Sequence, residues 1–133
     1  FVRGVVPKLQ FRTFRPSAAA ATAQLPCLIF AHGGAFAFGS IDSHEHITSR
    51  LALWSGCVIV SVEYRMFPEF TGAEAVADVF AVTRHVWKNA AALNVDPARI
   101  GVGGDSAGGN IAATVAMLAR DLGLTLALQL LVY

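Results

Sequence analysis

Four apolar runs divide the chain, and each predicts a strand. They are residues 25–31, 57–62, 100–103 and 124–133, and the second contains the β-branched residues Val58, Ile59 and Val60. Residues 8–15 alternate only in part between apolar and polar side chains, which is typical of a half-exposed strand near a sheet edge. The pattern therefore predicts central strands together with one strand close to an edge.

Three helices are predicted between these runs. The D-x-x-E pattern at residues 42–45 indicates a capping box that opens a helix through Leu53, which Gly56 ends. The T-x-x-E pattern at residues 71–74 opens a second helix, and a third begins near Ser106 and stops at Gly123. The faces expected to be buried are Val76, Phe80, Thr83 and Trp87 in the second helix and Ile111, Val115, Leu118 and Leu122 in the third.

Strands that alternate with helices predict an α/β fold. Such connections are right-handed crossovers, so the sheet should be mostly parallel and doubly wound. The hydrophobic content of 55% exceeds the globular norm of about 45–50%. A parallel sheet that is buried on both faces explains this excess.

Charge and hydropathy exclude several classes of partner. The net charge is +1, from 10 basic and 9 acidic residues, so neither nucleic acid nor an anionic membrane is indicated. Each apolar run is shorter than the ~20 residues that span a bilayer. Cys27 and Cys57 lie in strand-like runs without a C-x-x-C spacing, so we expect buried free thiols and a reducing, cytoplasmic compartment. The chain starts at Phe1, so a signal peptide cannot be assessed.

A candidate nucleophile lies between the third run and the third helix. Residues 104–108 read G-D-S-A-G, which is the G-x-S-x-G pattern of a strand-to-helix turn that holds a serine hydroxyl out of the sheet. Small neighbours allow the strained backbone of such a turn. The pattern predicts that Ser106 attacks an acyl carbon.

A glycine-rich turn follows the first run, at residues 32–36 (H-G-G-A-F). Acyl transfer passes through an oxyanion that needs preorganised N–H donors, and such a turn can present them without obstructing side chains. The amide of Ala107, in the first turn of the third helix, is a further donor that the helix dipole assists. The two segments together predict acyl-transfer chemistry, which needs neither a metal nor a cofactor.

At this point the chain resembles the hormone-sensitive-lipase-like carboxylesterases of the α/β-hydrolase fold. The matching segments are residues 32–36, 39–40, 61–65, 68–69 and 104–110, and the similarity covers nearly everything after Leu25. The resemblance implies a mostly parallel, doubly wound sheet with helices on both faces, incomplete here at both ends. Residues 1–133 are then a partial catalytic domain.

The resemblance also assigns roles within this sequence. It makes Ser106 the nucleophile, with the amides of Gly34, Ala35 and Ala107 as the oxyanion hole. Gly33 shapes the loop, and His32 braces it instead of serving as the base.

The chain departs from the family at two places. The family usually has glycine where Ala35 stands, so a methyl group crowds the acyl pocket or restricts the turn. Residues 70–73 (F-T-G-A) replace a common His-Pro-Phe-Pro, which we expect to alter a loop and not the chemistry.

The triad acid and histidine are expected beyond Tyr133, because the family order is nucleophile, acid, base. His44, His46 and His85 lie in helical patterns and are not favoured as the base. Residues 1–133 alone should therefore show little or no turnover.

Competing interpretations of several residues are less favoured. His44 and His46 are two apart on a helix and point to nearly opposite faces, which does not suit a metal site. A dinucleotide fingerprint near residue 101 lacks its third glycine, so no nucleotide cofactor is expected. Asp105 is expected to brace the elbow through backbone hydrogen bonds, and Arg65 to form a structural salt bridge instead of binding substrate.

The sequence predicts a serine carboxylesterase for small-molecule esters with short or medium acyl groups. Two alternatives stay open: a non-catalytic small-molecule binder, as in the gibberellin-receptor branch of the family, and an amidase or peptidase on the same scaffold. A histidine in the family's late loop would separate the enzyme from the binder. Oligomeric state is not indicated.

Overall fold

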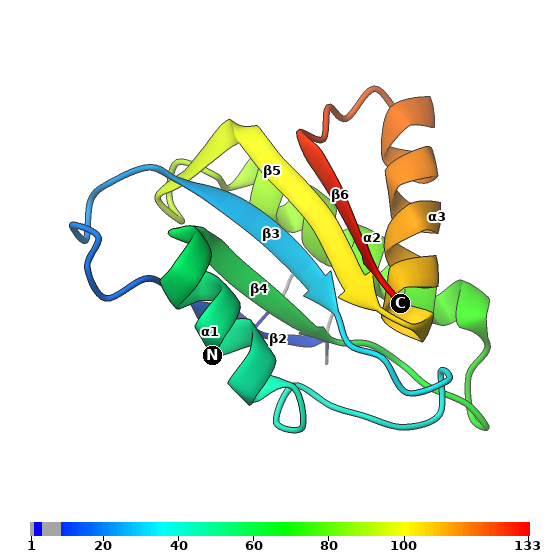
Figure 1. Cartoon of the computed structure of the whole chain (residues 1–133). Coiled ribbons are helices and arrows are strands. Elements are labelled where there is room, and N and C mark those ends of the chain that lie inside the picture. Colours follow the sequence, from blue (N-terminus) through cyan, green and yellow to red (C-terminus); the bar gives the residue numbers. More distant parts are fainter. Residues whose placement is uncertain (1, 4–8) are drawn as a thin grey trace.

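Six strands form one sheet in the computed structural model, which describes residues 2–3 and 9–133 (Figure 1). In chain order these strands are β1 (Val2–Arg3), β2 (Gln10–Phe14), β3 (Leu25–Ala31), β4 (Val58–Glu63), β5 (Val95–Asp105) and β6 (Leu128–Val132). Their spatial order is β1-β2-β4-β3-β5-β6. Strands β4, β3, β5 and β6 are parallel, while β1 and β2 are antiparallel to their neighbours. The predicted α/β fold with a mostly parallel sheet is confirmed.

Helices cover both faces of the sheet, as predicted. Helix α1 (Glu45–Ser55) packs on one face, where Ala52 joins a core with Leu28, Phe30 and Ile59. Helices α2 (Gly72–Lys88) and α3 (Ala107–Asp121) lie on the other face, over the larger core (Figure 1). None of the helices in the described ranges has the length and apolar character needed to cross a membrane.

The register aligns the carboxyl ends of the central strands. Ala31 of β3 pairs with Val62 of β4 and with Gly104 of β5, and Asp105 pairs with Val132 of β6. The loops that leave β3 and β5 therefore start at the same edge of the sheet. In open α/β sheets this edge is where ligands bind.

The predicted capping box of α1 is wrong, although Gly56 ends the helix in a left-handed conformation as expected. Helix α1 has His44 at its N-cap without a side-chain cap bond. Asp42 and Glu45 instead bind the guanidinium of Arg12 on β2, at 2.7 and 2.6 Å. Their carboxylates tie the helix start to the sheet because a cation from a neighbouring strand lies within reach.

The capping box of α2 is confirmed, but its predicted buried face is rotated. Thr71 accepts from the amide of Ala73, and Glu74 accepts from the amide of Thr71. Of the predicted face only Thr83 is fully buried, while Val76 and Phe80 are half-buried and Trp87 is 39% exposed. The buried side chains are Ala75, Asp78, Val79, Val82, Thr83 and Val86.

The predicted core stripe of α3 is correct only in its first half. Ile111 and Val115 are fully buried, whereas Leu118 and Leu122 are 37% and 64% exposed. Small residues take the places against the sheet: Gly108, Ala112 and Ala119. They allow α3 to approach closely, since a Cβ on Gly108 would collide with the carbonyl of Ala31. Gly123 ends this segment with φ +72°.

The partly alternating segment forms β2, which is one strand in from the edge. Phe11 is buried between exposed or half-buried neighbours. Lys8, at the start of the predicted segment, lies outside the described residues. The fourth apolar run contributes β6, whose side chains are mostly exposed.

Candidate active site

Ser106 occupies a strained turn between β5 and α3. Its backbone has φ 50° and ψ −117°, a region that L residues rarely adopt, and its side chain is exposed. The Ser106 amide donates to the carbonyl of Val132 at 2.8 Å, which ties the turn to β6. A Cβ at Gly104 would collide with the carbonyl of Ala31, so this position requires glycine. The turn holds the serine hydroxyl away from the sheet.

The loop after β3 has an unusual backbone of its own. Gly34, Ala35 and Phe36 all have positive φ, at 127°, 52° and 62°. The amides of Ala37 and Phe38 donate to the carbonyl of Gly34 at 2.9 and 2.8 Å. In the described part of the chain, the amides of Gly34 and Ala35 donate to no backbone carbonyl. Ala35 is exposed, so its methyl group lies on the surface of the loop.

Asp105 joins the two loops. Its Oδ1 accepts the amide proton of Gly33 at 2.9 Å. A Cβ on Gly33 would collide with the same carboxylate, so the glycine allows the backbone to approach it. We expected Asp105 to brace its own turn. It reaches instead across to the loop after β3, and it thereby sets the distance between that loop and Ser106.

His32 is fully buried behind this loop. Its Nδ1 lies 2.9 Å from the carbonyl oxygen of Gly33, and its ring stacks on Tyr64 with centroids 4.3 Å apart. The Tyr64 hydroxyl donates to the carbonyl of His32 at 2.6 Å. Burial lowers the pKa of His32 and raises that of Tyr64, so both side chains stay neutral near neutral pH. These contacts tie the start of the loop to the segment after β4.

Arg65 forms a salt bridge, as expected of a structural residue. Its Nε and Nη2 donate to the two carboxylate oxygens of Asp78 at 2.9 and 2.7 Å, and its backbone amide donates to the same carboxylate at 3.0 Å. Asp78 is buried on α2. The pair fixes the chain after β4 to the helix that covers the sheet.

The other three histidines lie in or next to helices. His44 precedes α1 with its Nε2 3.5 Å from Oδ1 of Asp105, while His46 is exposed. His85 lies in α2, where its ring is 5.8 Å from that of Phe11. Within the described ranges, no three His, Cys, Asp or Glu side chains gather as metal ligands.

Comparisons of this chain with known proteins agree with the geometry of the two loops. A family model described as the alpha/beta hydrolase fold matches residues 28–133, which include both loops. The chain belongs to the hormone-sensitive-lipase-like family of α/β hydrolases. It shares 44% identity over 99 residues with carboxylesterase NlhH of Mycobacterium tuberculosis, covering 74% of this chain and 31% of that protein.

Solved structures give the same result. An esterase of Pyrobaculum calidifontis superposes with a TM-score of 0.82 at 43% identity, over 88% of this chain and 37% of that one. A bacterial heroin esterase superposes with a TM-score of 0.88 at 37% identity, over 92% of this chain and 38% of that one. The chain spans about a third of the length of the curated relatives with the strongest matches, covering 31–35% of three of them.

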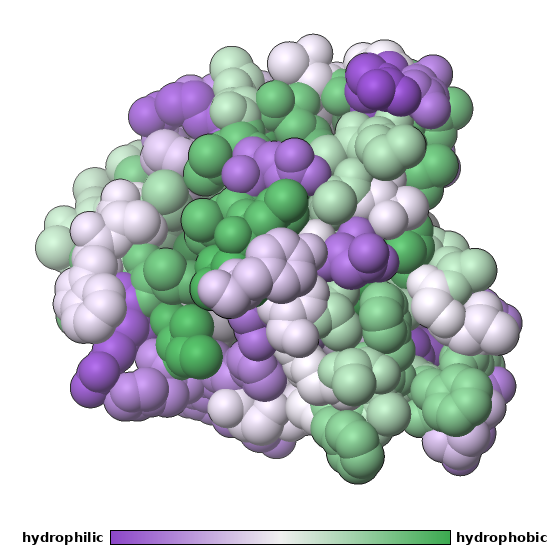
Figure 2. Space-filling view, turned by 45° about the vertical axis from the view of Figure 1, so that its right-hand side comes forward, coloured by the Kyte–Doolittle hydropathy of each residue, from purple (hydrophilic) through white to green (hydrophobic). Residues whose placement is uncertain are grey.

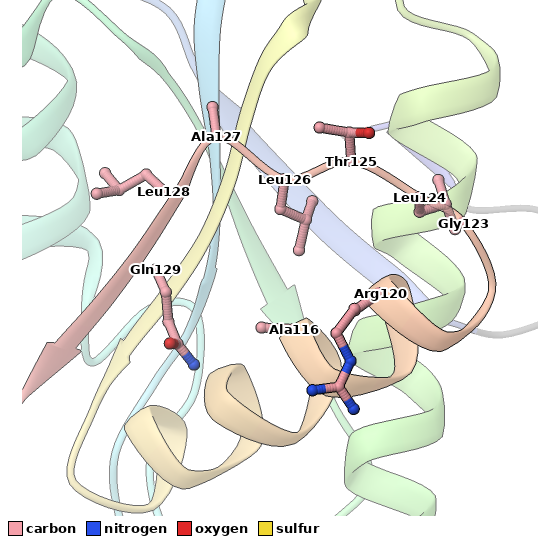
Figure 3. A pocket seen from close by; sticks show the side chains of 9 residues that line it. All are labelled: Ala116, Arg120, Gly123, Leu124, Thr125, Leu126, Ala127, Leu128 and Gln129. Atoms are coloured by element: carbon pink, nitrogen blue, oxygen red, sulfur yellow. The ribbon is translucent and has the colours of Figure 1, made fainter.

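A hollow of about 440 Å³ in this α/β hydrolase lies away from the two loops (Figure 3). It lies between the end of α3, at Ala116 and Arg120, and the segment 123–129 that leads into β6. That segment approaches the amino end of β6, whereas Ser106 contacts its carboxyl end at Val132. The hollow is therefore not the site around Ser106.

Sequence reasoning missed the supports behind the α/β-hydrolase site. Glu63 accepts from the amide of Ile41 at 2.9 Å, and Tyr64 holds His32. Asp78 was a detectable signal, since a carboxylate on the buried face of a helix needs a cation or hydrogen-bond donors to pair with. His44 left no comparable signal, because only the fold brings it to Asp105.

Proposed function

We propose that this protein is a serine carboxylesterase for small-molecule esters. The observation that carries the proposal is the exposed Ser106 on a turn of positive φ, joined through Asp105 to a loop whose Gly34 and Ala35 amides donate to no backbone carbonyl within the described residues. The names of the relatives, carboxylesterase and esterase, support the same reaction class.

In the proposed reaction, Ser106 Oγ attacks the ester carbonyl while a base accepts its proton. The amides of Gly34, Ala35 and Ala107 stabilise the oxyanion of the tetrahedral intermediate. The intermediate collapses to an acyl-serine, and the leaving alkoxide takes the proton back as the alcohol. Water then attacks the acyl-serine, releases the acid and restores the hydroxyl.

The base and its acid are proposed to lie beyond Tyr133, in a longer catalytic domain of which residues 1–133 are part. Three observations support this: the family order of nucleophile, acid and base, the length of the relatives, and the exposed apolar residues of β6. The last are Leu128, Leu131 and Val132.

A reducing, cytoplasmic location is part of the proposal. Cys27 and Cys57 are both free, but only Cys27 is buried; Cys57, also expected to be buried, is half-buried. Burial, and secondarily the neighbouring Cys57, raises the pKa of the Cys27 thiol to about 12, so that thiol is unreactive.

Replacement of Ser106 by alanine in the full gene product tests the function. We expect hydrolysis of p-nitrophenyl butyrate to fall by roughly 10⁴-fold or more, because the nucleophile is lost. Ser17→Ala, in the exposed turn after β2, is the matched control and should behave like the parent. Full turnover by Ser106→Ala would refute the assignment. A folded parent that binds esters without hydrolysing them would favour the binder, and faster cleavage of a matched amide would favour an amidase.

A further inference from the structure

The segment that joins the loop of residues 33–38 to α1 returns to the carboxyl edge of the sheet (Figure 1). Its turn is closed by two serines: the amide of Ser40 donates to Ser43 Oγ at 2.8 Å, and the amide of Ser43 donates to Ser40 Oγ at 3.1 Å. The amide of Ile41 donates to the Glu63 carboxylate at 2.9 Å. The turn is therefore fixed to the end of β4.

His44 follows this turn and faces the carboxylate beside the nucleophile. Its Nε2 lies 3.5 Å from Oδ1 of Asp105, and its Nδ1 lies 2.9 Å from Oγ of Ser43. The side chains of His44 and Asp105 are only 16% and 29% exposed, so water screens their interaction partly. The His44 ring also lies near that of His32, with centroids 5.4 Å apart. Ser43 Oγ therefore lies within hydrogen-bond distance of Nδ1, and the Asp105 carboxylate lies within ion-pair distance of Nε2.

Asp105 connects His44 to the proposed oxyanion loop. The Oδ1 atom that faces His44 is the same atom that accepts the amide proton of Gly33. Gly33 directly precedes Gly34, whose amide is a proposed oxyanion donor. A rotation of the carboxylate would therefore move or release the loop on one side and disturb the turn at Ser106 on the other.

We propose that His44 is a positioning residue for the proposed ester hydrolysis. It holds the Asp105 carboxylate in the orientation that keeps the Gly33 amide, and with it the oxyanion loop, opposite Ser106. The inference rests on the proposed function. Donors that act on the oxyanion contribute in the transition state and not in the bound ester, so their displacement lowers kcat and changes KM little.

Two substitutions of near-equal size separate the contacts of His44. In His44→Gln the longer side chain carries an amide N–H toward Asp105, where Nε2 lies. In His44→Asn the amide reaches only the position of Nδ1 beside Ser43. We expect His44→Asn to lower kcat by roughly 10- to 100-fold at little-changed KM. His44→Gln should recover most of that loss.

The measurement is steady-state hydrolysis of p-nitrophenyl butyrate by the full gene product, with thermal unfolding of each variant. His46→Ala is the matched control, since His46 is exposed in the first turn of α1, which His44 precedes. Parental kcat in His44→Asn, beside turnover that Ser106→Ala abolishes, overturns the inference and leaves the proposed function standing.

The remaining outcomes also decide. If kcat falls equally in His44→Asn and His44→Gln, and both variants have a lower unfolding midpoint, His44 has a role in folding only. That result overturns the inference. If neither variant folds, the role is structural, which overturns it as well. A parent without turnover, or turnover retained in Ser106→Ala, refutes the proposed function and the inference with it.

Discussion

At the scale of single residues, burial decides the charge of His32. Burial lowers the pKa of this imidazole below its ordinary 6.5. Below about pH 6.5 the unfolded chain therefore binds a proton that the folded chain does not bind. The contribution of His32 to stability is fully present above pH 6.5 and is lost as the pH falls toward the folded pKa. One such group changes the free energy of unfolding by at most about 1.4 kcal/mol per pH unit.

We predict that His32→Asn reduces this dependence on pH. The introduced carboxamide does not titrate, and its N–H can still donate to the carbonyl of Gly33. Urea unfolding between pH 7 and pH 5 should give a shallower slope for the variant than for the parent. The other three histidines are common to both proteins and serve as the internal control. Parallel slopes would show that His32 does not remain neutral in the fold.

At the scale of elements, α2 depends on a side-chain cap that α1 lacks. Thr71 accepts from the amide of Ala73 at 3.3 Å, and its own amide donates to Glu74 at 2.7 Å. Thr71→Ala should lower the free energy of unfolding by about 1 kcal/mol, measured by urea denaturation. Thr71→Ser keeps the hydroxyl and should recover most of the loss. Asp42→Ala removes only an exposed ion pair with Arg12 and should lower the free energy of unfolding by less than Thr71→Ala does. A larger loss in Asp42→Ala than in Thr71→Ala would contradict the capping argument.

The helices also show what periodicity predicts and what it misses. The capping box of α2 was predictable because both of its partners are local. The capping box predicted for α1 does not form, because Arg12, distant in sequence, binds the carboxylates of both Asp42 and Glu45. The second half of the buried face of α3 was predicted wrongly, because apolar spacing favours the large residues Leu118 and Leu122 over small ones such as Ala119. Close approach to the carbonyl of Ala31, at the end of β3, requires glycine at position 108. Ala112 is buried as well, whereas Leu118 stays at the surface.

At the scale of the whole molecule, the order of elements was predictable and the contacts between loops were not. Parallel strands and crossover helices follow from apolar runs that alternate with helical patterns, and in such a sheet the loops after β3 and β5 leave at the same edge. The bond from Gly33 to Asp105 spans 72 positions in the sequence. No local pattern reports such a bond, and the same holds for the support that Tyr64 gives to His32.

One side of the molecule carries a large apolar surface. The view that brings β6 and α3 forward shows extensive green, hydrophobic areas among polar ones (Figure 2). Exposed side chains of these two elements are Met117, Leu118, Leu128, Leu131 and Val132. The proposed longer domain accounts for this surface, because further strands beside β6 would bury it.

The proposed domain predicts the behaviour of residues 1–133 prepared alone. In the described chain, Ser106 Oγ makes no hydrogen bond to a histidine, which agrees with the proposed base beyond Tyr133. Loss of the base costs roughly 10⁶-fold in kcat in a serine hydrolase, and we expect no Ser106-dependent hydrolysis of p-nitrophenyl butyrate. Circular dichroism must first show a folded chain, and the full gene product is the positive control. Robust turnover by folded residues 1–133, abolished in Ser106→Ala, would place the base within this chain and refute its location beyond Tyr133.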